Sequence, residues 1–201
     1  MENFYLIAGL GNPGEEYSGT RHNIGFMLAE RLAKSWAADW KLERKFHARV
    51  ARTERDGRKI ILCQPQTFMN DSGEAIGALQ RFYQLPKARL LVAVDDADLP
   101  LGQIRMRAEG SSGGHHGLES IEQHLSSRGF ARLKIGIGRK NEVREITNHV
   151  LGKFDSAEGK LMEKVLDRAA NQVETWLDAG IEKAMNQFNG VVDSANEEKT
   201  K

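Results

Sequence analysis

The chain is 201 residues long, with 40% hydrophobic residues, 28% charged residues and a formal net charge of +1. This is the composition of a globular protein, and no apolar run approaches the roughly 20 residues that a membrane-spanning helix needs, which argues against membrane insertion. The single cysteine, Cys63, excludes an intrachain disulfide and any multi-cysteine metal site, and its place in the apolar run 60–63 predicts a buried structural thiol.

A strand, a glycine turn and a helix are predicted at the N-terminus. Residues 4–8 form an apolar run without a preceding basic region, so no signal peptide is visible and we expect a cytoplasmic protein. The glycine turn occupies residues 9–14. Apolar side chains then recur with helical spacing from Ile24 to Trp36, which predicts an amphipathic helix over that stretch.

A β-hairpin and a second helix follow. Apolar and polar residues alternate over residues 46–50, Asp56-Gly57 is a hairpin turn signal, and residues 59–63 supply the returning strand. Asp71 and Glu74 have the spacing of a capping box, which predicts that a helix begins at this point.

The second half of the chain interleaves strands and helices. The predicted elements are strands at residues 90–94 and 104–108, a glycine-rich loop at 110–117, a helix at 118–125, a strand at 133–137 and two C-terminal helices separated by Gly180. Strands separated by helices, together with hairpin-like pairs, predict an α/β fold: a single three-layer domain with a mixed, mostly parallel sheet flanked by helices. We assign residues 1–190 to this domain and residues 191–201 to a polar, disordered tail.

The glycine turn matches the G-x-G-x-x-G pattern of dinucleotide-binding sites. In such sites the helix begins at the second glycine, and an acidic residue ends a second strand about 20 residues later. Here residues 17–20 intervene before the helix, and Glu30 lies inside the helical stripe. The context disfavours a nucleotide cofactor, and an ordinary tight turn after a strand stays open as the simpler explanation.

Two side chains at the carboxyl ends of predicted strands suggest acid–base chemistry. His22 follows the glycine turn at a helix start, where the helix dipole disfavours imidazolium, so His22 is a candidate general base. Asp95 ends a buried strand and could orient the imidazole by accepting its second N–H. The alternatives are a structural role for His22, and a turn or a divalent-metal loop for the aspartates at 95, 96 and 98.

Water is the expected nucleophile, because no serine or cysteine lies in a nucleophile-elbow pattern. Asn70 lies in a third loop that follows a predicted strand. Its amide could hold a peptide group or a developing oxyanion, and a helix N-cap is the alternative for this residue.

The charge is distributed unevenly along the chain. Residues 41–59 hold eight Lys or Arg against three Asp or Glu, and residues 128–144 hold six against one. Such segments fit either a phosphate-binding face or an ordinary solvated surface.

Five motifs, in order along the chain, carry a resemblance to a known family. They are Gly9-Leu-Gly-Asn-Pro-Gly14, Tyr17-x-x-Thr20-Arg-His-Asn-x-Gly25, Thr67-Phe-Met-Asn70-x-Ser-Gly73, Asp95-x-x-Asp98-Leu-Pro-x-Gly102 and Gly113-Gly-His-x-Gly117-Leu. In this combination, and over the chain as far as about Gly190, the sequence resembles the bacterial peptidyl-tRNA hydrolase family. The resemblance implies an esterase without metal or cofactor that releases a peptide from the 3′ end of tRNA, and so recycles tRNA from drop-off products.

The resemblance also implies roles for individual residues. His22 would activate the water, Asp95 would keep His22 basic, and Asn12 would help to distinguish N-blocked peptidyl-tRNA from aminoacyl-tRNA. Contacts with the substrate and its tRNA would come from Tyr17, Phe68, Met69, Asn70, His116, Arg107, Lys134, Arg139 and Lys140.

This chain departs from the family pattern at two of these positions. His116 stands where the family usually has asparagine, and Lys134 stands where arginine is common, a change that keeps the charge and loses the bidentate geometry. We expect a monomer. A non-catalytic α/β nucleotide- or RNA-binding module, with a structural His22, is the alternative function.

Overall fold

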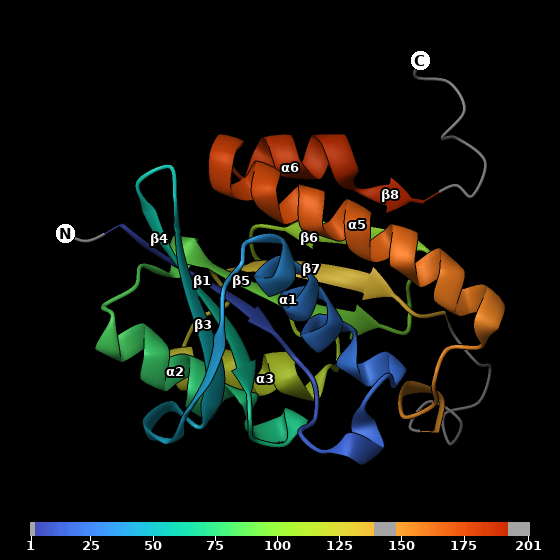
Figure 1. The fold of residues 1–201 in the computed structure, drawn as a ribbon, viewed down its shortest axis with the longest axis horizontal. Helices are drawn as coiled ribbons and strands as arrows, with labels where there is room; N and C mark the ends of the chain where they lie inside the picture. The colour runs from blue at the N-terminus through green and yellow to red at the C-terminus, as the bar shows by residue number, and fades with distance from the viewer. Residues whose placement is uncertain (1–2, 139–147, 193–201) are drawn as a thin grey trace.

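The computed structural model of the protein describes residues 3–138 and 148–192, which form one sheet covered by helices on both faces (Figure 1). The strands are β1 (Phe4–Gly9), β2 (Trp40–Glu43), β3 (Ala48–Arg55), β4 (Arg58–Pro65), β5 (Leu90–Asp96), β6 (Gln103–Arg107), β7 (Ala131–Gly136) and β8 (Gly190–Val191). The helices are α1 (Ile24–Ser35), α2 (Ser72–Phe82), α3 (His116–Leu125), α5 (Ser156–Ala179) and α6 (Ile181–Phe188), and the short 3₁₀ turns are η1 (Glu15–Tyr17), η2 (Arg21–Asn23), η3 (Arg44–Phe46), η4 (Met69–Asp71) and η5 (Lys87–Arg89). The predicted α/β architecture with a mixed sheet is confirmed.

The sheet has the strand order β2-β3-β4-β1-β5-β7-β6-β8. The four central strands, β4, β1, β5 and β7, pair in parallel, and the outer pairs are antiparallel. The first strand, β1, lies in the middle because it pairs with β4 on one side and with β5 on the other. The carboxyl ends of the central strands therefore meet along one edge, which is where α/β sheets hold their ligands.

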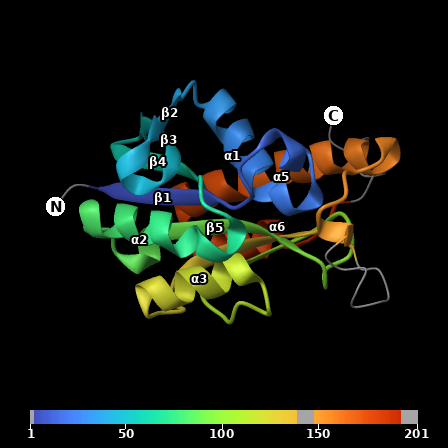
Figure 2. The ribbon, with the colours of Figure 1, turned by 90° about the horizontal axis from the view of Figure 1, so that it is seen from below.

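Helices form a layer on each face of the sheet. α1, α5 and α6 pack on one face, and α2 and α3 pack on the other, as the view from below shows (Figure 2). Alternate residues of β1 serve the two layers: Ile7 belongs to the core under α1 and α5, whereas Leu6 and Ala8 belong to the core under α2 and α3. None of the helices among the described residues combines the length and apolar character of a transmembrane span.

Cys63 lies on β4 and is fully buried in the core under α2 and α3. Burial raises the pKa of its thiol far above the ordinary value, because the apolar surroundings disfavour the thiolate. The thiol therefore stays protonated, which fits the structural role predicted for it.

Two glycines allow α1 to begin directly against the end of β1. A Cβ atom on Gly9 would overlap the backbone of Gly25, and a Cβ atom on Gly25 would overlap the backbone of Leu10 and Ala93. Backbone hydrogen bonds fasten the same contact: the Leu10 N–H donates to the Ala93 oxygen at 3.0 Å, and the Phe26 N–H donates to the Leu10 oxygen at 3.2 Å. The glycine turn thus serves close packing of helix against strand, and it brings the residues just before α1 to the end of β5.

The capping box predicted for α2 is wrong. The Asp71 side chain makes no N-cap hydrogen bond, because Asp71 belongs to the 3₁₀ turn η4 that runs directly into α2. Glu74 faces His47 instead, with 3.4 Å between its Oε2 and Nδ1 of the imidazole. No pattern in the sequence predicts β2, which is four residues long and lies at the edge of the sheet.

The sheet continues into the first residues of the predicted tail. Val191 belongs to β8, which pairs with β6, and the Val192 N–H donates to the Gly102 oxygen at 2.9 Å. The remainder of the predicted tail, residues 193–201, lies outside the described residues.

Candidate active site

A pocket of about 490 Å³ opens at the carboxyl edge of the sheet, over the ends of β5 and β7 and beside the start of α3. Five of the predicted site residues line it: Asn12, His22, Asp95, His116 and Lys134. They come from the loop after β1, from β5 and β7, and from the first turn of α3. The topology therefore brings together residues that lie up to 122 positions apart in the sequence, counted from Asn12 to Lys134 (134 − 12).

His22 and Asp95 form a hydrogen-bonded pair in this pocket. The Nδ1 atom of His22 lies 2.9 Å from Oδ1 of Asp95, and the two side chains are 17% and 4% exposed. A carboxylate only accepts hydrogen bonds, so His22 carries its proton on Nδ1 and presents the lone pair of Nε2 to the pocket. Such an imidazole can accept a proton from a bound water molecule.

A second histidine, His115, contacts the same carboxylate and is not among the predicted site residues. Its Nε2 lies 3.1 Å from Oδ1 of Asp95. As the N-cap residue of α3, His115 accepts the Leu118 N–H on Nδ1 at 3.3 Å. Because Nδ1 is an acceptor, the ring proton is on Nε2, and His115 is a neutral donor to Asp95. Its only signal in the sequence is its place beside His116 in the glycine-rich motif.

Asp95 is therefore a buried carboxylate with two N–H donors on one oxygen. Burial by itself would raise the pKa of Asp95, but the hydrogen bonds from His115 and His22 outweigh burial and hold this pKa well below its usual range. Because the pKa is lower in the folded state than the ordinary value of about 3.9, ionised Asp95 stabilises the fold fully above about pH 4. This contribution is lost as the pH falls through the lower, folded-state pKa.

The same three side chains have a spacing that could hold a metal ion. One potential ligand atom each from His22, Asp95 and His115 lie within 4.8 Å of one another, the one such group among the described residues. Nδ1 of His22 and Nε2 of His115 each hydrogen-bond to Oδ1 of Asp95, so a metal ion bound through these three atoms would have to displace both shared protons. Asp96 does not join the group, because its Oδ2 pairs with Nζ of Lys134 at 3.0 Å.

Asn12 lies in the pocket wall with its amide held in one orientation. Its backbone N–H donates to Oδ1 of Asn23, and Nδ2 of Asn23 donates back to the Asn12 oxygen, both at 2.9 Å. Its side-chain Oδ1 accepts the Met69 N–H at 2.8 Å. Nδ2 is therefore the atom that Asn12 offers to a ligand. Met69 contacts Asn12 through its backbone N–H, and its side chain is buried.

Five of the described residues predicted as contacts lie outside the lining of this pocket, Met69 and the four that follow. Phe68 is 58% exposed, and Asn70 is exposed within η4. Tyr17 is partly buried at the end of η1, and Arg107 is exposed at the end of β6. None of these side chains lines the pocket, so they remain predictions as substrate contacts.

His116 lines the pocket from the first turn of α3, but its side chain is 77% exposed. Its Nδ1 lies 3.1 Å from Oε2 of Glu119, on the next turn of the same helix. The resemblance expects an asparagine at this position. The imidazole found there already has the Glu119 carboxylate as a partner at Nδ1.

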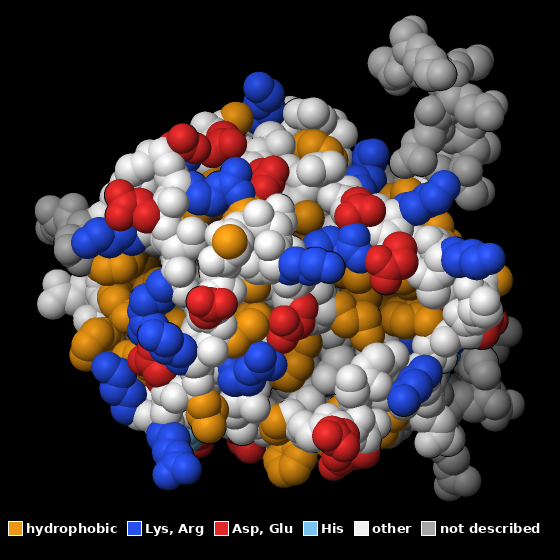
Figure 3. Space-filling view, viewed as in Figure 1, with side chains coloured by type: hydrophobic (Ala, Val, Ile, Leu, Met, Phe, Trp, Pro, Cys, Tyr) orange, Lys and Arg blue, Asp and Glu red, His pale blue; other side chains and the backbone are white. Residues whose placement is uncertain are grey.

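The basic segment 41–59 covers β2, η3 and β3 and reaches the start of β4, and Lys and Arg side chains gather at the left of the face in Figure 3. Four of its arginines are paired with carboxylates: Arg49 with Glu30, Arg52 with Glu43, Arg55 with Glu174 and Arg58 with Asp178. These pairs satisfy half of the eight cations in the segment, which favours a structural surface over a phosphate-binding face. In the other basic segment, Arg132 is buried and lies 3.3 Å from Glu122, whereas Arg139 and Lys140 fall outside the described residues.

Comparison with known proteins gives one consistent family. A family model described as peptidyl-tRNA hydrolase matches residues 6–199. The peptidyl-tRNA hydrolase of Thermoanaerobacter sp. (strain X514) is 48% identical over 186 residues, which cover 92% of this chain and 100% of that protein. The protein of the same name from Synechococcus sp. (strain JA-2-3B'a(2-13)) is 45% identical over 184 residues, which cover 92% and 82%. The crystal structure of peptidyl-tRNA hydrolase from Acinetobacter baumannii superposes with a TM-score of 0.89 at 40% identity, covering 95% of this chain and 97% of that one.

Proposed function

Because the chain belongs to the peptidyl-tRNA hydrolase family, we propose that it hydrolyses the ester bond between a peptide and the 3′-terminal ribose of tRNA, with His22 as the general base. The observation that carries this proposal is the His22–Asp95 pair, which leaves an unprotonated Nε2 facing a pocket at the sheet edge. The biological consequence is the return of tRNA from prematurely released peptides to translation, so we also propose a cytoplasmic location. A monomer stays a prediction.

In the proposed reaction, Nε2 of His22 accepts a proton from water while the water oxygen attacks the ester carbonyl carbon. Negative charge moves to the carbonyl oxygen, the bond from carbon to the ribose oxygen breaks, and the imidazolium returns its proton to the leaving ribose oxygen. The products are the free peptide acid and a tRNA with a free 3′-terminal ribose, so atoms and charges balance. Asp95 holds the imidazole in place and stabilises the imidazolium between the two proton transfers.

Two groups at the pocket wall would recognise the acyl part of the substrate. The first turn of α3 directs the positive end of its helix dipole toward the pocket, where a developing oxyanion would be stabilised. We assign to Nδ2 of Asn12 a hydrogen bond to the amide that joins the last residue to the rest of the peptide, a group that an aminoacyl-tRNA lacks. Tyr17, Phe68 and Asn70 are proposed as further substrate contacts around the pocket.

The tRNA side of the substrate is assigned to β6 and β7. Lys134 and Arg107 lie on these adjacent antiparallel strands, and we propose that both face tRNA phosphates. Lys134 is held by Asp96, so a phosphate would compete with this carboxylate for the ammonium group. Arg139 and Lys140 remain candidates for the same role.

The proposed function is tested directly with N-acetyl-aminoacyl-tRNA in the presence of EDTA, by following release of the acylated amino acid. We expect multiple turnovers, with unblocked aminoacyl-tRNA cleaved far more slowly and with a KM that rises with salt, because phosphate contacts release counterions. Absence of turnover in EDTA, restored by a divalent metal, would overturn the metal-free reaction. Tight tRNA binding without turnover under either condition would instead favour the alternative of a non-catalytic RNA-binding module.

The contact of His115 with Asp95 leads to a prediction about pH dependence. In His115→Asn, the asparagine can still cap α3, but it cannot supply the N–H that reaches Asp95. With one donor fewer, the Asp95 carboxylate holds the His22 N–H more strongly, so the acid limb of kcat/KM should move to higher pH.

The control for this prediction is His115→Ala, which removes both the N–H donor and the helix cap. It should show the same displacement of the acid limb and, in addition, a loss of about 1 kcal/mol in stability, or roughly 3 °C in Tm. An acid limb in His115→Asn that superimposes on the wild-type limb would mean that His115 only caps the helix.

A further inference from the structure

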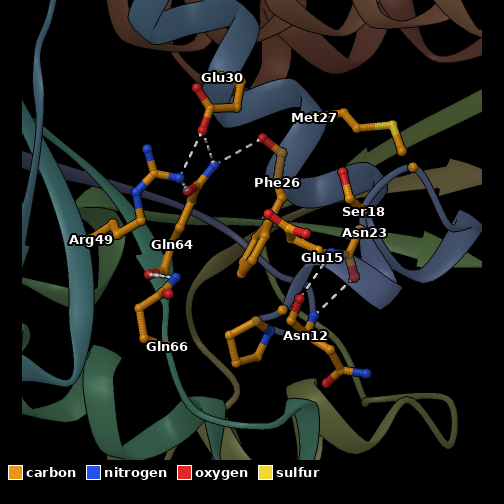
Figure 4. Close-up of a pocket in the computed structure, with 13 residues that line it drawn as sticks. Asn12, Glu15, Ser18, Asn23, Phe26, Met27, Glu30, Arg49, Gln64 and Gln66 are labelled. Carbon is orange, nitrogen blue, oxygen red and sulfur yellow. Dashed lines mark hydrogen bonds and ion pairs between the residues drawn. The ribbon is translucent and has the colours of Figure 1, made fainter.

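A second hollow, of about 400 Å³, lies next to the pocket of His22 and shares Asn12 with it. We call it the distal pocket. Its walls are the loop of residues 12–19, the side chains of Phe26 and Met27 on α1, and Arg49 and Gln66 beside β3 and β4. Figure 4 shows the strand residues on one side, the loop residues on the other and Phe26 between them. Apart from Asn12, no residue of this hollow has a role in the proposed reaction at His22.

Two charged groups of the distal pocket, Glu30 and Arg49, are held in place by a buried glutamine. Gln64 is 1% exposed. Its Nε2 donates to the Phe26 oxygen at 3.2 Å and to Oε1 of Glu30 at 3.0 Å, and its Oε1 accepts from Arg49 at 3.0 Å. Nε1 of Trp40 donates to the other oxygen of Glu30 at 2.9 Å. Figure 4 shows the contacts around Gln64. Side chains fixed in this way lose little conformational entropy when a ligand arrives, which favours binding.

The chemistry of the walls fits a peptide better than a nucleic acid. Glu15 and Glu30 give the pocket two carboxylates against the single guanidinium of Arg49, a balance that repels phosphate. Apolar surface from Phe26 and Met27 lies beside these polar groups. A few residues of peptide offer the same mixture of amide groups and apolar side chains.

The position of the distal pocket matches the direction in which a peptide would leave the ester. The pocket of His22 lies over β5 and β7, and the distal pocket lies over β4 and β3, with β1 between them. The proposed tRNA contacts are on β6 and β7, so the peptide extends the other way. From β5 to β4 is two strand spacings, about 10 Å, which about three residues of extended chain can span.

We propose that the distal pocket binds the peptide part of the substrate, from about the third residue counted from the ester. This inference rests on the proposed function, and it adds a dependence on peptide length. An N-acetyl-tetrapeptidyl-tRNA reaches the distal pocket, whereas an N-acetyl-aminoacyl-tRNA ends before it. The ratio of kcat/KM for the longer to the shorter substrate, made with one tRNA and one ester-linked residue, should be about tenfold in the wild type.

The test uses one variant that narrows the distal pocket and one that removes its positive charge, and it measures the same ratio of kcat/KM for the longer to the shorter substrate. Ser18→Trp places a large side chain at an exposed position of the wall, and Arg49→Gln removes the guanidinium together with the hydrogen bond that it donates to Gln64. Each should lower the ratio to about twofold or less. The matched controls are Ser35→Trp, at an exposed position at the end of α1, and Arg55→Gln, an ion-paired arginine of β3 outside the pocket.

The outcomes separate the two hypotheses. A wild-type ratio near one, or a ratio that stays at the wild-type value in both Ser18→Trp and Arg49→Gln, overturns the assignment of the distal pocket. Equal loss of the ratio in the two control variants overturns it as well, since the effect would then be general. Failure of the wild type to cleave either substrate contradicts the proposed function itself.

Discussion

Replacing His22 by alanine is expected to lower kcat by about a thousandfold or more, with little change in the affinity for uncleaved substrate. The reason is that Nε2 of His22 is the proton acceptor proposed for the attacking water, and a general base typically contributes 10²- to 10⁴-fold. The affinity for tRNA should be kept because the proposed tRNA contacts lie on β6 and β7, whereas His22 lies in η2. The measurement is single-turnover cleavage of N-acetyl-aminoacyl-tRNA together with tRNA binding by filter retention.

Asp95→Asn should slow cleavage as well, and the two effects should not multiply. An amide in place of the carboxylate no longer fixes the imidazole proton on Nδ1 and no longer stabilises the imidazolium. Once His22 is absent, however, the carboxylate has nothing to orient, so the double variant should be about as slow as His22→Ala alone. Losses that multiply would show that Asp95 and His22 act independently. His47→Ala, an exposed histidine outside the pocket, serves as the control for removing an imidazole.

The second large effect is expected on stability, from Gly25→Ala. The new methyl group would overlap the backbone of Leu10 and Ala93, so α1 would have to move away from the end of β1. Displacement of a tightly packed helix costs about 3 kcal/mol or more, which corresponds to a fall in Tm of roughly 10 °C for a chain of this size. The loss of activity should be larger than the fall in stability alone explains, because His22 lies three residues before the displaced glycine.

Gly159→Ala is the matched control for this prediction. Gly159 also lies in a helix, α5, but no atom comes within 4 Å of a Cβ built there. Alanine should therefore raise the stability by about 0.5–1 kcal/mol through its higher helix propensity. If Gly25→Ala also left the Tm unchanged or raised it, the close approach of α1 to β1 would not be what requires glycine at this position.

The sequence predicts much of the fold and part of the site. The mixed α/β sheet follows from apolar runs and helical spacing, and the meeting of His22 with Asp95 follows from the rule that loops after central strands share one edge. His115 could not be predicted in this way, because its role depends on two contacts of one ring, with Asp95 and with the Leu118 N–H. Neither contact leaves a spacing pattern in the sequence.

Other details escape prediction for local reasons. The edge strand β2 has a short and mostly polar sequence, Trp40-Lys-Leu-Glu43, so its pairing with β3 decides its conformation. Asp71 and Glu74 have the right spacing for a capping box, but the turn η4 already leads the chain into α2. The distal pocket also has no linear signature, because its walls come from a loop, a helix and two strands.

The central place of β1 has a consequence for the synthesis of this protein. β1 is made before the other strands of this sheet, and both of its neighbours, β4 and β5, come later in the chain. The last residue of β5 is made 87 residues after the last residue of β1 (96 − 9). At about 5–20 residues per second, the apolar first strand therefore waits roughly 4–17 s before both of its edges can be covered. Until β5 is made, at least one edge of β1 stays unpaired, and an exposed strand edge is a site for chaperone binding and for aggregation.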